Sequence, residues 1–136
     1  MLPDRTDITR AVFNTRGLYM QPKKMKQLRI FVSSTDVVDH HLLYEGIIRR
    51  AKKYGLDGAT AIKGRMGFGI SSELHNSRFF ELVEKFPMVV LMIDTPEKIE
   101  GFLQEILPWL EKQPKGCLVT TQDVDVYLAK KGDTKQ

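Results

Sequence analysis

The chain is poor in cysteine and has no long apolar run, and each scarcity excludes a class of protein. Its single cysteine, Cys117, cannot form an internal disulfide and rules out a zinc site built from several cysteines. We expect it to be a small buried side chain. No apolar run approaches the roughly 20 residues that cross a bilayer, and the N-terminus lacks the apolar segment of a signal peptide. The prediction is a cytoplasmic protein without membrane insertion.

Charge of one sign is in slight excess, with 21 Lys and Arg against 17 Asp and Glu in 136 residues, a net charge of +4. Nucleic-acid binding would need basic residues interleaved with exposed aromatics or a known module, and neither is present. A small anionic ligand needs far fewer charges. Seven basic residues before residue 54 are predicted to be solvated: Lys23, Lys24, Lys26, Arg49, Arg50, Lys52 and Lys53.

Hydrophobic periodicity predicts one folded domain over residues 25–130, since the length suits about one domain. Residues 1–24 lack periodicity and are predicted to be a loose N-terminal extension, and residues 131–136 a flexible tail. Strands are expected at 26–32, 58–64, 87–94 and 118–126. A first helix follows Asp39 as its cap and ends at Gly55. A second begins at Thr95-Pro96 and should kink or end at Pro108.

The order βαββαβ is that of an α+β, ferredoxin-like sandwich, with a four-stranded antiparallel sheet and two helices on one face. The other face of such a sheet must be polar or be covered. Residues 87–94 are apolar on both sides of the strand, so a partner subunit is expected there. Met88, Val90 and Met92 lie on one side of this strand, and Val89, Leu91 and Ile93 lie on the other.

The glycine-rich stretch 64–69, Gly-Arg-Met-Gly-Phe-Gly, is the candidate binding site. Such glycines indicate backbone that bends, takes positive φ or is closely approached. They would let anionic oxygens reach backbone N–H groups. The alternative is a β-bulge without a ligand. The candidate ligand-binding residues, including two from the polar segment that follows, are Lys63, Arg65, Gly67, Phe68, Gly69, His75 and Arg78.

No catalytic set, metal site or cofactor motif is predicted. The stretch 64–69 is neither a Walker loop nor a dinucleotide fingerprint, because no Gly-Lys-Ser/Thr and no helix follows it. His40 and His41 are adjacent and do not share a helix face, which argues against a metal site.

Several stretches together resemble one family. Gly58-Ala59-Thr60, Gly67-Phe68-Gly69 and the strand 87–94, with residues 42–45 and Gly55, resemble the domain of unknown function one-ninety family of divergent PII-like proteins over about residues 26–128. The resemblance implies a homotrimer with its sheets facing inward, related to PII signalling proteins that bind adenine nucleotides between subunits.

The resemblance carries over to only part of the PII nucleotide site. Gly67, Phe68 and Gly69 stand where PII proteins have a Gly-Phe-Gly at the start of the T-loop. Residues 94–98 lack the second glycine-rich segment with its lysine, and residues 120–123 lack the paired basic residues. A triphosphate site of PII type is therefore not expected.

The favoured interpretation is a non-enzymatic, trimeric PII-like sensor that binds an adenine nucleotide or related anion between subunits. One alternative is a small ferredoxin-like enzyme with a pocket between sheet and helices, for which Tyr44, Glu45 and His75 are the available acid–base groups. Another is a trimer that responds to a divalent metal.

Overall fold

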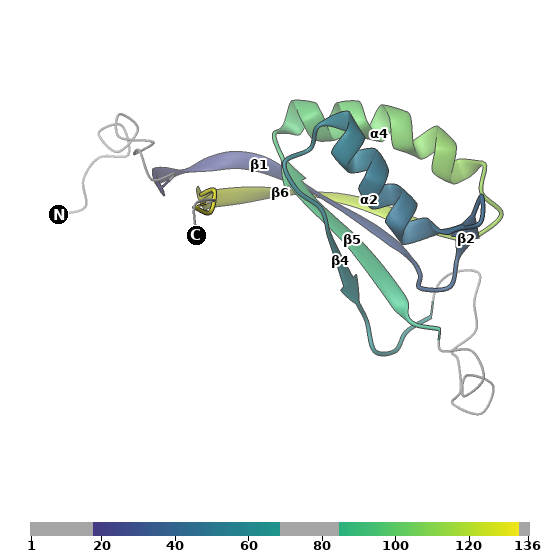
Figure 1. Ribbon diagram of the computed structural model, residues 1–136. Helices are drawn as coiled ribbons and strands as arrows, with labels where there is room; N and C mark the ends of the chain where they lie inside the picture. Colours follow the sequence, from purple (N-terminus) through teal and green to yellow (C-terminus); the bar gives the residue numbers. More distant parts are fainter. Residues whose placement is uncertain (1–17, 69–84, 134–136) are drawn as a thin grey trace. The chain divides into compact units, whose positions relative to one another are not determined.

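The computed structural model describes residues 18–68 and 85–133. Four strands form one sheet in the order β4-β5-β1-β6, and two short strands form a hairpin (Figure 1). The described elements, in chain order, are β1 (Leu18–Ser33), β2 (Val37–Val38), β3 (His41–Leu42), α2 (Leu43–Tyr54), β4 (Thr60–Lys63), β5 (Pro87–Asp94), α4 (Pro96–Glu111) and β6 (Leu118–Leu128). This is the predicted βαββαβ order with the β2–β3 hairpin added before the first helix. No helix of the described part is long and apolar enough to cross a membrane.

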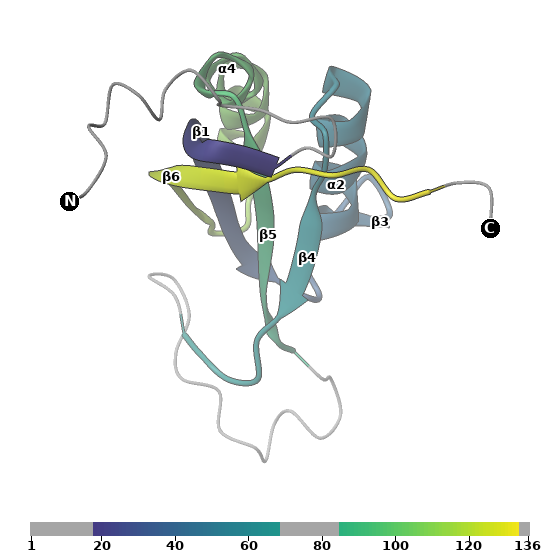
Figure 2. The same ribbon diagram turned by 90° about the vertical axis from the view of Figure 1, so that its left-hand side faces the viewer.

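The chain divides into two compact units, residues 26–122, and residues 1–25 together with 123–136. In the first unit, α2 and α4 cover one face of the sheet (Figure 2). β1 and β5 are antiparallel neighbours, with Lys26 opposite Asp94 and Ser33 opposite Pro87. In the second unit, an ion pair of 2.7 Å joins Lys24 to Asp125.

The core lies between the sheet and the two helices, and it follows from the period of each element. Alternate strand positions and every third or fourth helix position face inward, as those periods require. Fully buried members include Leu28 and Ile30 of β1, Val90 of β5, Ile47 of α2 and Phe102 of α4. The apolar alternation predicted for residues 87–94 is confirmed on this side, where Met88, Val90 and Met92 are buried.

β1 begins at Leu18, eight residues before the predicted strand start. Residues 18–24 are therefore strand and not loose chain, while residues 1–17 lie outside the described part. Pro22 breaks the alternation there, and a proline in a run argues against a strand when only local pattern is read. These residues form a strand because they pair with β6, which lies far along the chain. A local sequence pattern does not report such pairing.

The predicted cap of the first helix is wrong. Leu42 occupies the N-cap position without a side-chain hydrogen bond. Asp39 and His40 instead form the turn of the β2–β3 hairpin, with φ of 52° and 67°. Two consecutive positive φ values are the pattern of a two-residue hairpin turn. Such turns usually have the sequence Asn-Gly, and this one has Asp-His, so the hairpin could not be predicted from the sequence.

The other helix boundaries behave as predicted, with one exception. Gly55 ends α2 with φ of 107°, and Thr95 caps α4 by accepting a hydrogen bond from the N–H of Lys98 at 3.3 Å. Of the two outcomes predicted at Pro108, a kink or the end of the helix, the end is wrong, because α4 continues to Glu111. Cys117, expected to be buried, is exposed.

Candidate functional site

Gly64 lies directly against Pro87, where β4 meets the start of β5. Its N–H donates to the carbonyl oxygen of Pro87 at 2.7 Å. A Cβ placed on Gly64 would lie 2.7 Å from Cγ of Pro87, closer than real Cβ contacts come. Close approach is therefore the reason for this glycine. Positive φ is not the reason, because among the described glycines it occurs at Gly55 and not at Gly64.

The residues around Gly64 hold three strand ends together, namely the end of β1, the end of β4 and the start of β5. Ser34, just after β1, donates from its N–H to the carbonyl of Phe86 at 2.8 Å. The N–H of Phe86 donates back to Oγ of Ser34 at 2.8 Å. The ammonium of Lys63 lies 3.8 Å from the centre of the Phe86 ring, a cation–π contact. The chain is thus fixed at the end of β4 by contacts with Phe86 and Pro87, and Phe86 is in turn held by Ser34.

Beyond Gly64, the chain presents apolar and basic side chains to solvent. Met66 and Phe68 are 68% and 72% exposed, and Arg65 is exposed beside them. Within residues 18–68 and 85–133, no acceptor lies within hydrogen-bond distance of the N–H groups of residues 65–68. Unpaired N–H groups next to a cation are suited to an anion.

Four of the seven predicted ligand-binding residues fall in the described part. Lys63, Arg65, Gly67 and Phe68 follow one another at the end of β4. Gly69, His75 and Arg78 lie outside the described residues. Of the acid–base groups of the enzyme alternative, Tyr44 packs partly against the core and Glu45 is 4.0 Å from Arg49.

The sheet face turned away from the helices is mostly apolar. Ile62 of β4, Val89 of β5 and Phe31 of β1 are opposite one another in a row across three strands. Leu91 lies in the next row, between Thr60 and Arg29. The Nε atom of Arg29 is buried here without a hydrogen-bond partner in the described part of the chain, which is costly for a charged group.

Two features escaped prediction from sequence. Asp94, buried at the end of β5, accepts hydrogen bonds from the N–H groups of Asp57 at 2.9 Å and Thr95 at 2.7 Å. An acid ending an apolar strand was the only signal. The second is a cavity on the helix layer, where the Arg50 guanidinium lies 4.0 Å from the Trp109 ring centre. The available signal was the spacing of the basic residues of α2, since Arg49 and Arg50 precede Lys53 by four and three residues.

The fold is shared with solved PII-like proteins. CPII of Thiomonas intermedia K12, solved with ADP and bicarbonate, matches with a TM-score of 0.57 at 17% identity, over 77% of this chain and 90% of that one. A putative PII-like signalling protein of Thermus thermophilus matches with a TM-score of 0.50 at 18% identity, over 76% and 89%. The molecule is thus an α+β protein of the PII-like fold, as the sequence predicted.

Sequence relatives identify the family within that class. Residues 25–126 match the model of family DUF190, described as Uncharacterized ACR. A UPF0166 protein of Aquifex aeolicus is 38% identical over 110 residues, 80% of this chain and 100% of that one. Another, of Methanocaldococcus jannaschii, is 29% identical over 111 residues, 82% and 96%. The chain belongs to the DUF190 family, which confirms the resemblance.

Proposed function

We propose that the protein is a non-enzymatic PII-like sensor. It assembles as a homotrimer and binds an adenine nucleotide or related anion in clefts between subunits, beside the glycine-rich end of β4. The observation that carries this proposal is the apolar sheet face that the described helices leave uncovered, together with the exposed side chains of Arg65, Met66 and Phe68 after its edge strand β4.

The uncovered face calls for another protein surface. Burial of apolar area is the main favourable term in association, and a contiguous apolar patch on one face marks an interaction site. Ile93 is 36% exposed and Ile62 48% exposed in the single chain. A second copy that covers this face would also bring backbone carbonyls or carboxylates within reach of Arg29. Assembly therefore removes the apolar exposure and satisfies the buried Nε atom.

The proposed ligand site at residues 65–68 combines positive charge, backbone N–H donors and an aromatic side chain. The N–H groups of residues 65–68 and the Arg65 guanidinium are the donors for anionic oxygens. Phe68 supplies a face for a planar base. Gly69, His75 and Arg78 complete the proposed ligand set.

The neighbouring structures support an adenine nucleotide or a small anion as the ligand. CPII was solved with ADP, AMP and bicarbonate, and this chain shares its fold. Residues 94–98 offer no glycine-rich segment; Asp94 is instead committed to two backbone N–H groups. A long polyphosphate therefore lacks part of its binding surface, and we expect AMP and ADP to bind more tightly than ATP.

Isothermal titration calorimetry with AMP, ADP, ATP, cyclic AMP, S-adenosylmethionine and bicarbonate tests the ligand. We expect AMP or ADP to bind, and Arg65→Gln to weaken that binding about tenfold, as loss of a charge-assisted hydrogen bond does. Lys115→Gln, an exposed cation after α4, is the matched control and should bind like the wild type. Absence of heat with all six compounds contradicts the proposed ligand class.

The assembly is tested separately by light scattering after size exclusion. A trimer gives three times the chain mass of 15.6 kDa. A monomer at micromolar concentration contradicts the proposal, whatever the calorimetry shows.

Among the described residues no group of three or more His, Cys, Asp and Glu could hold a metal ion, so nothing there favours the metal-responsive alternative.

A further inference from the structure

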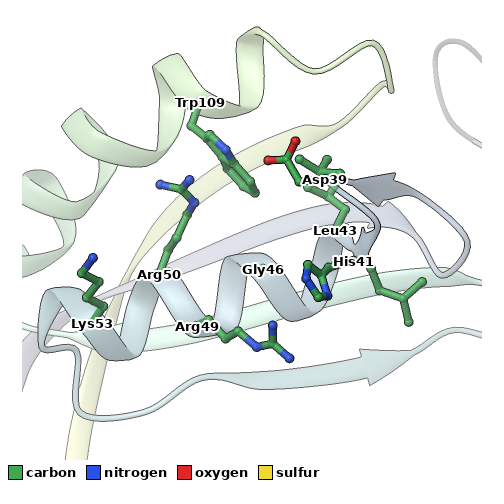
Figure 3. A pocket seen from close by; sticks show the side chains of 10 residues that line it. Asp39, His41, Leu43, Gly46, Arg49, Arg50, Lys53 and Trp109 are labelled. Carbon is green, nitrogen blue, oxygen red and sulfur yellow. The ribbon is translucent and has the colours of Figure 1, made fainter.

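A cavity of about 310 Å³ opens on the helix layer between α2, the end of α4 and the β2–β3 hairpin (Figure 3). This volume lies at the lower end of the range for small-molecule sites. Every lining residue belongs to the unit 26–122. They are Val38, Asp39, His41, Leu42, Leu43, Gly46, Arg49, Arg50, Lys53 and Trp109.

One wall of the cavity is an indole held in place from two sides. The Arg50 guanidinium lies 4.0 Å from the centre of the Trp109 ring. On the side of α2, a Cβ at Gly46 would lie 3.4 Å from the indole atom Cη2, so Trp109 packs directly against the helix there. An amphipathic ring is thereby exposed to the cavity with its position fixed.

Another wall of the cavity is the β2–β3 hairpin, which is fixed to the body of the unit. The N–H of Leu43 donates to the carbonyl oxygen of Asp36 at 2.7 Å, and the Asp36 carboxylate accepts from the N–H of Ser33 at 3.0 Å. Residues 39 and 40 both have positive φ, which non-glycine residues adopt at a cost. This turn places Asp39 among the residues that line the cavity (Figure 3).

The charges that line the cavity are predominantly positive. Arg49, Arg50 and Lys53 contribute three cations, against one carboxylate, that of Asp39. Glu45 lies 4.0 Å from Arg49. Among the described residues, no carboxylate comes within ion-pair distance of Arg50 or Lys53. Like charges at adjacent turns of a helix are destabilising unless an anion joins them.

We propose that this cavity is a binding site for a small organic phosphate, distinct from the cleft at the end of β4. Arg50 and Lys53 donate to the phosphate oxygens, for which a planar guanidinium has matching geometry. Trp109 packs against the body of the ligand, and Asp39 accepts a hydrogen bond from a hydroxyl group of that body. The site lies within one subunit and does not depend on the proposed function.

Trp109 makes the test specific, because it is the one tryptophan of the chain. The wild-type protein is titrated with inorganic phosphate, ribose 5-phosphate and ribose, with sodium chloride at matched ionic strength, and Trp109 fluorescence is followed. The expected result is a saturable change with both phosphates, tighter for ribose 5-phosphate, and none with ribose or chloride. Equal affinity for the two phosphates would overturn the role of Asp39.

Two neighbouring lysines of α2 provide a matched pair of variants. Lys53 lines the cavity and Lys52 does not, although both are exposed and both lie in the last turn of α2. Lys53→Gln should weaken ribose 5-phosphate binding about tenfold, whereas Lys52→Gln should leave it unchanged. Circular dichroism melts confirm that both variants fold. An unsaturable response, or equal effects of the two substitutions, overturns the proposal.

Discussion

At the scale of single residues, the glycines of the 64–69 stretch have different roles. Gly64 is required by contact with Pro87, which makes it part of the scaffold. At Gly67 a Cβ would lie 3.6 Å from Cγ of Pro87, an ordinary contact. The second glycine therefore has no packing reason in the described structure, and backbone access for a ligand is the reason that we propose for it.

Gly64→Ala is expected to lower the free energy of unfolding by about 1–3 kcal/mol, the usual cost of inserting a methyl group into filled space. Urea denaturation measures it. Gly58→Ala is the control, because a Cβ there meets nothing within 4 Å, and it should change stability by less than about 0.5 kcal/mol. Equal effects at the two positions would show that the contact with Pro87 is unimportant.

The thiol of Cys117 is expected to alkylate slowly. Partial shielding from solvent, and then the Asp36 carboxylate, raise the pKa of this thiol above its usual range. Less thiolate is then present at a given pH, and the thiolate is the reactive form. Iodoacetamide should therefore react more slowly with the folded chain than with the chain unfolded in urea, and most of the difference should vanish above the folded pKa. A faster reaction in the folded chain contradicts this.

At the scale of elements, the start of α4 shows how a strand end and a helix start are fixed together. The Asp94 carboxylate accepts from the N–H of Asp57 at 2.9 Å and from that of Thr95 at 2.7 Å. Lys98, one turn later, donates to the carbonyl oxygen of Gly55 at 3.1 Å. The loop after α2, the end of β5 and the start of α4 are thus joined by one buried acid and one lysine.

Asp94→Ala should destabilise the protein by about 3 kcal/mol, because two N–H groups lose their acceptor beside a buried site. Thermal and urea melts measure the loss. Asp57→Ala is the control: it removes an exposed carboxylate 3.7 Å from Lys98 but keeps the N–H that Asp94 binds. That variant should stay within about 0.5 kcal/mol of the wild type. A similar loss of stability in both variants would show that the effect comes from removing a negative charge and not from the two hydrogen bonds of Asp94.

Elements with strong local signals were predictable from sequence. β5 matches its predicted range at both ends, since turn-forming and capping residues flank a continuous apolar run. The β2–β3 hairpin was not predictable, because each strand has two residues and its turn is Asp39-His40. The first half of β1 was missed because long-range pairing creates it. The stretch 64–68 was found by its glycines, whereas the Trp109 cavity arises from two helices and a hairpin that only the fold brings together.

At the scale of the whole molecule, the sheet in the unit 26–122 has one face covered by α2 and α4 and a second face that these helices do not cover. The residues of the uncovered face come from three strands that are 27 or more residues apart in the chain, as Phe31, Ile62 and Val89 show. Such a surface is specified by the register of the sheet. A change at its centre should therefore affect association more than folding.

Val89→Asp is expected to convert the proposed trimer into monomers of 15.6 kDa, because the substitution removes apolar contact area and a carboxylate buried at the interface loses its hydration. Light scattering measures the mass, and circular dichroism confirms the fold. Leu107→Asp, on an exposed apolar position of α4, should leave the mass unchanged. If the Val89 variant keeps the wild-type mass, the sheet face is not the interface.

The position of β1 between β5 and β6 matters during synthesis of the chain. Its partner residues on β5 follow it by between 54 residues (Ser33 to Pro87) and 68 residues (Lys26 to Asp94). At about 5–20 residues per second, the nascent strand waits about 3–14 seconds for that partner. Leu28, Ile30 and Val32 have no sheet to join until then. This segment is where a ribosome-associated chaperone is expected to bind the emerging chain.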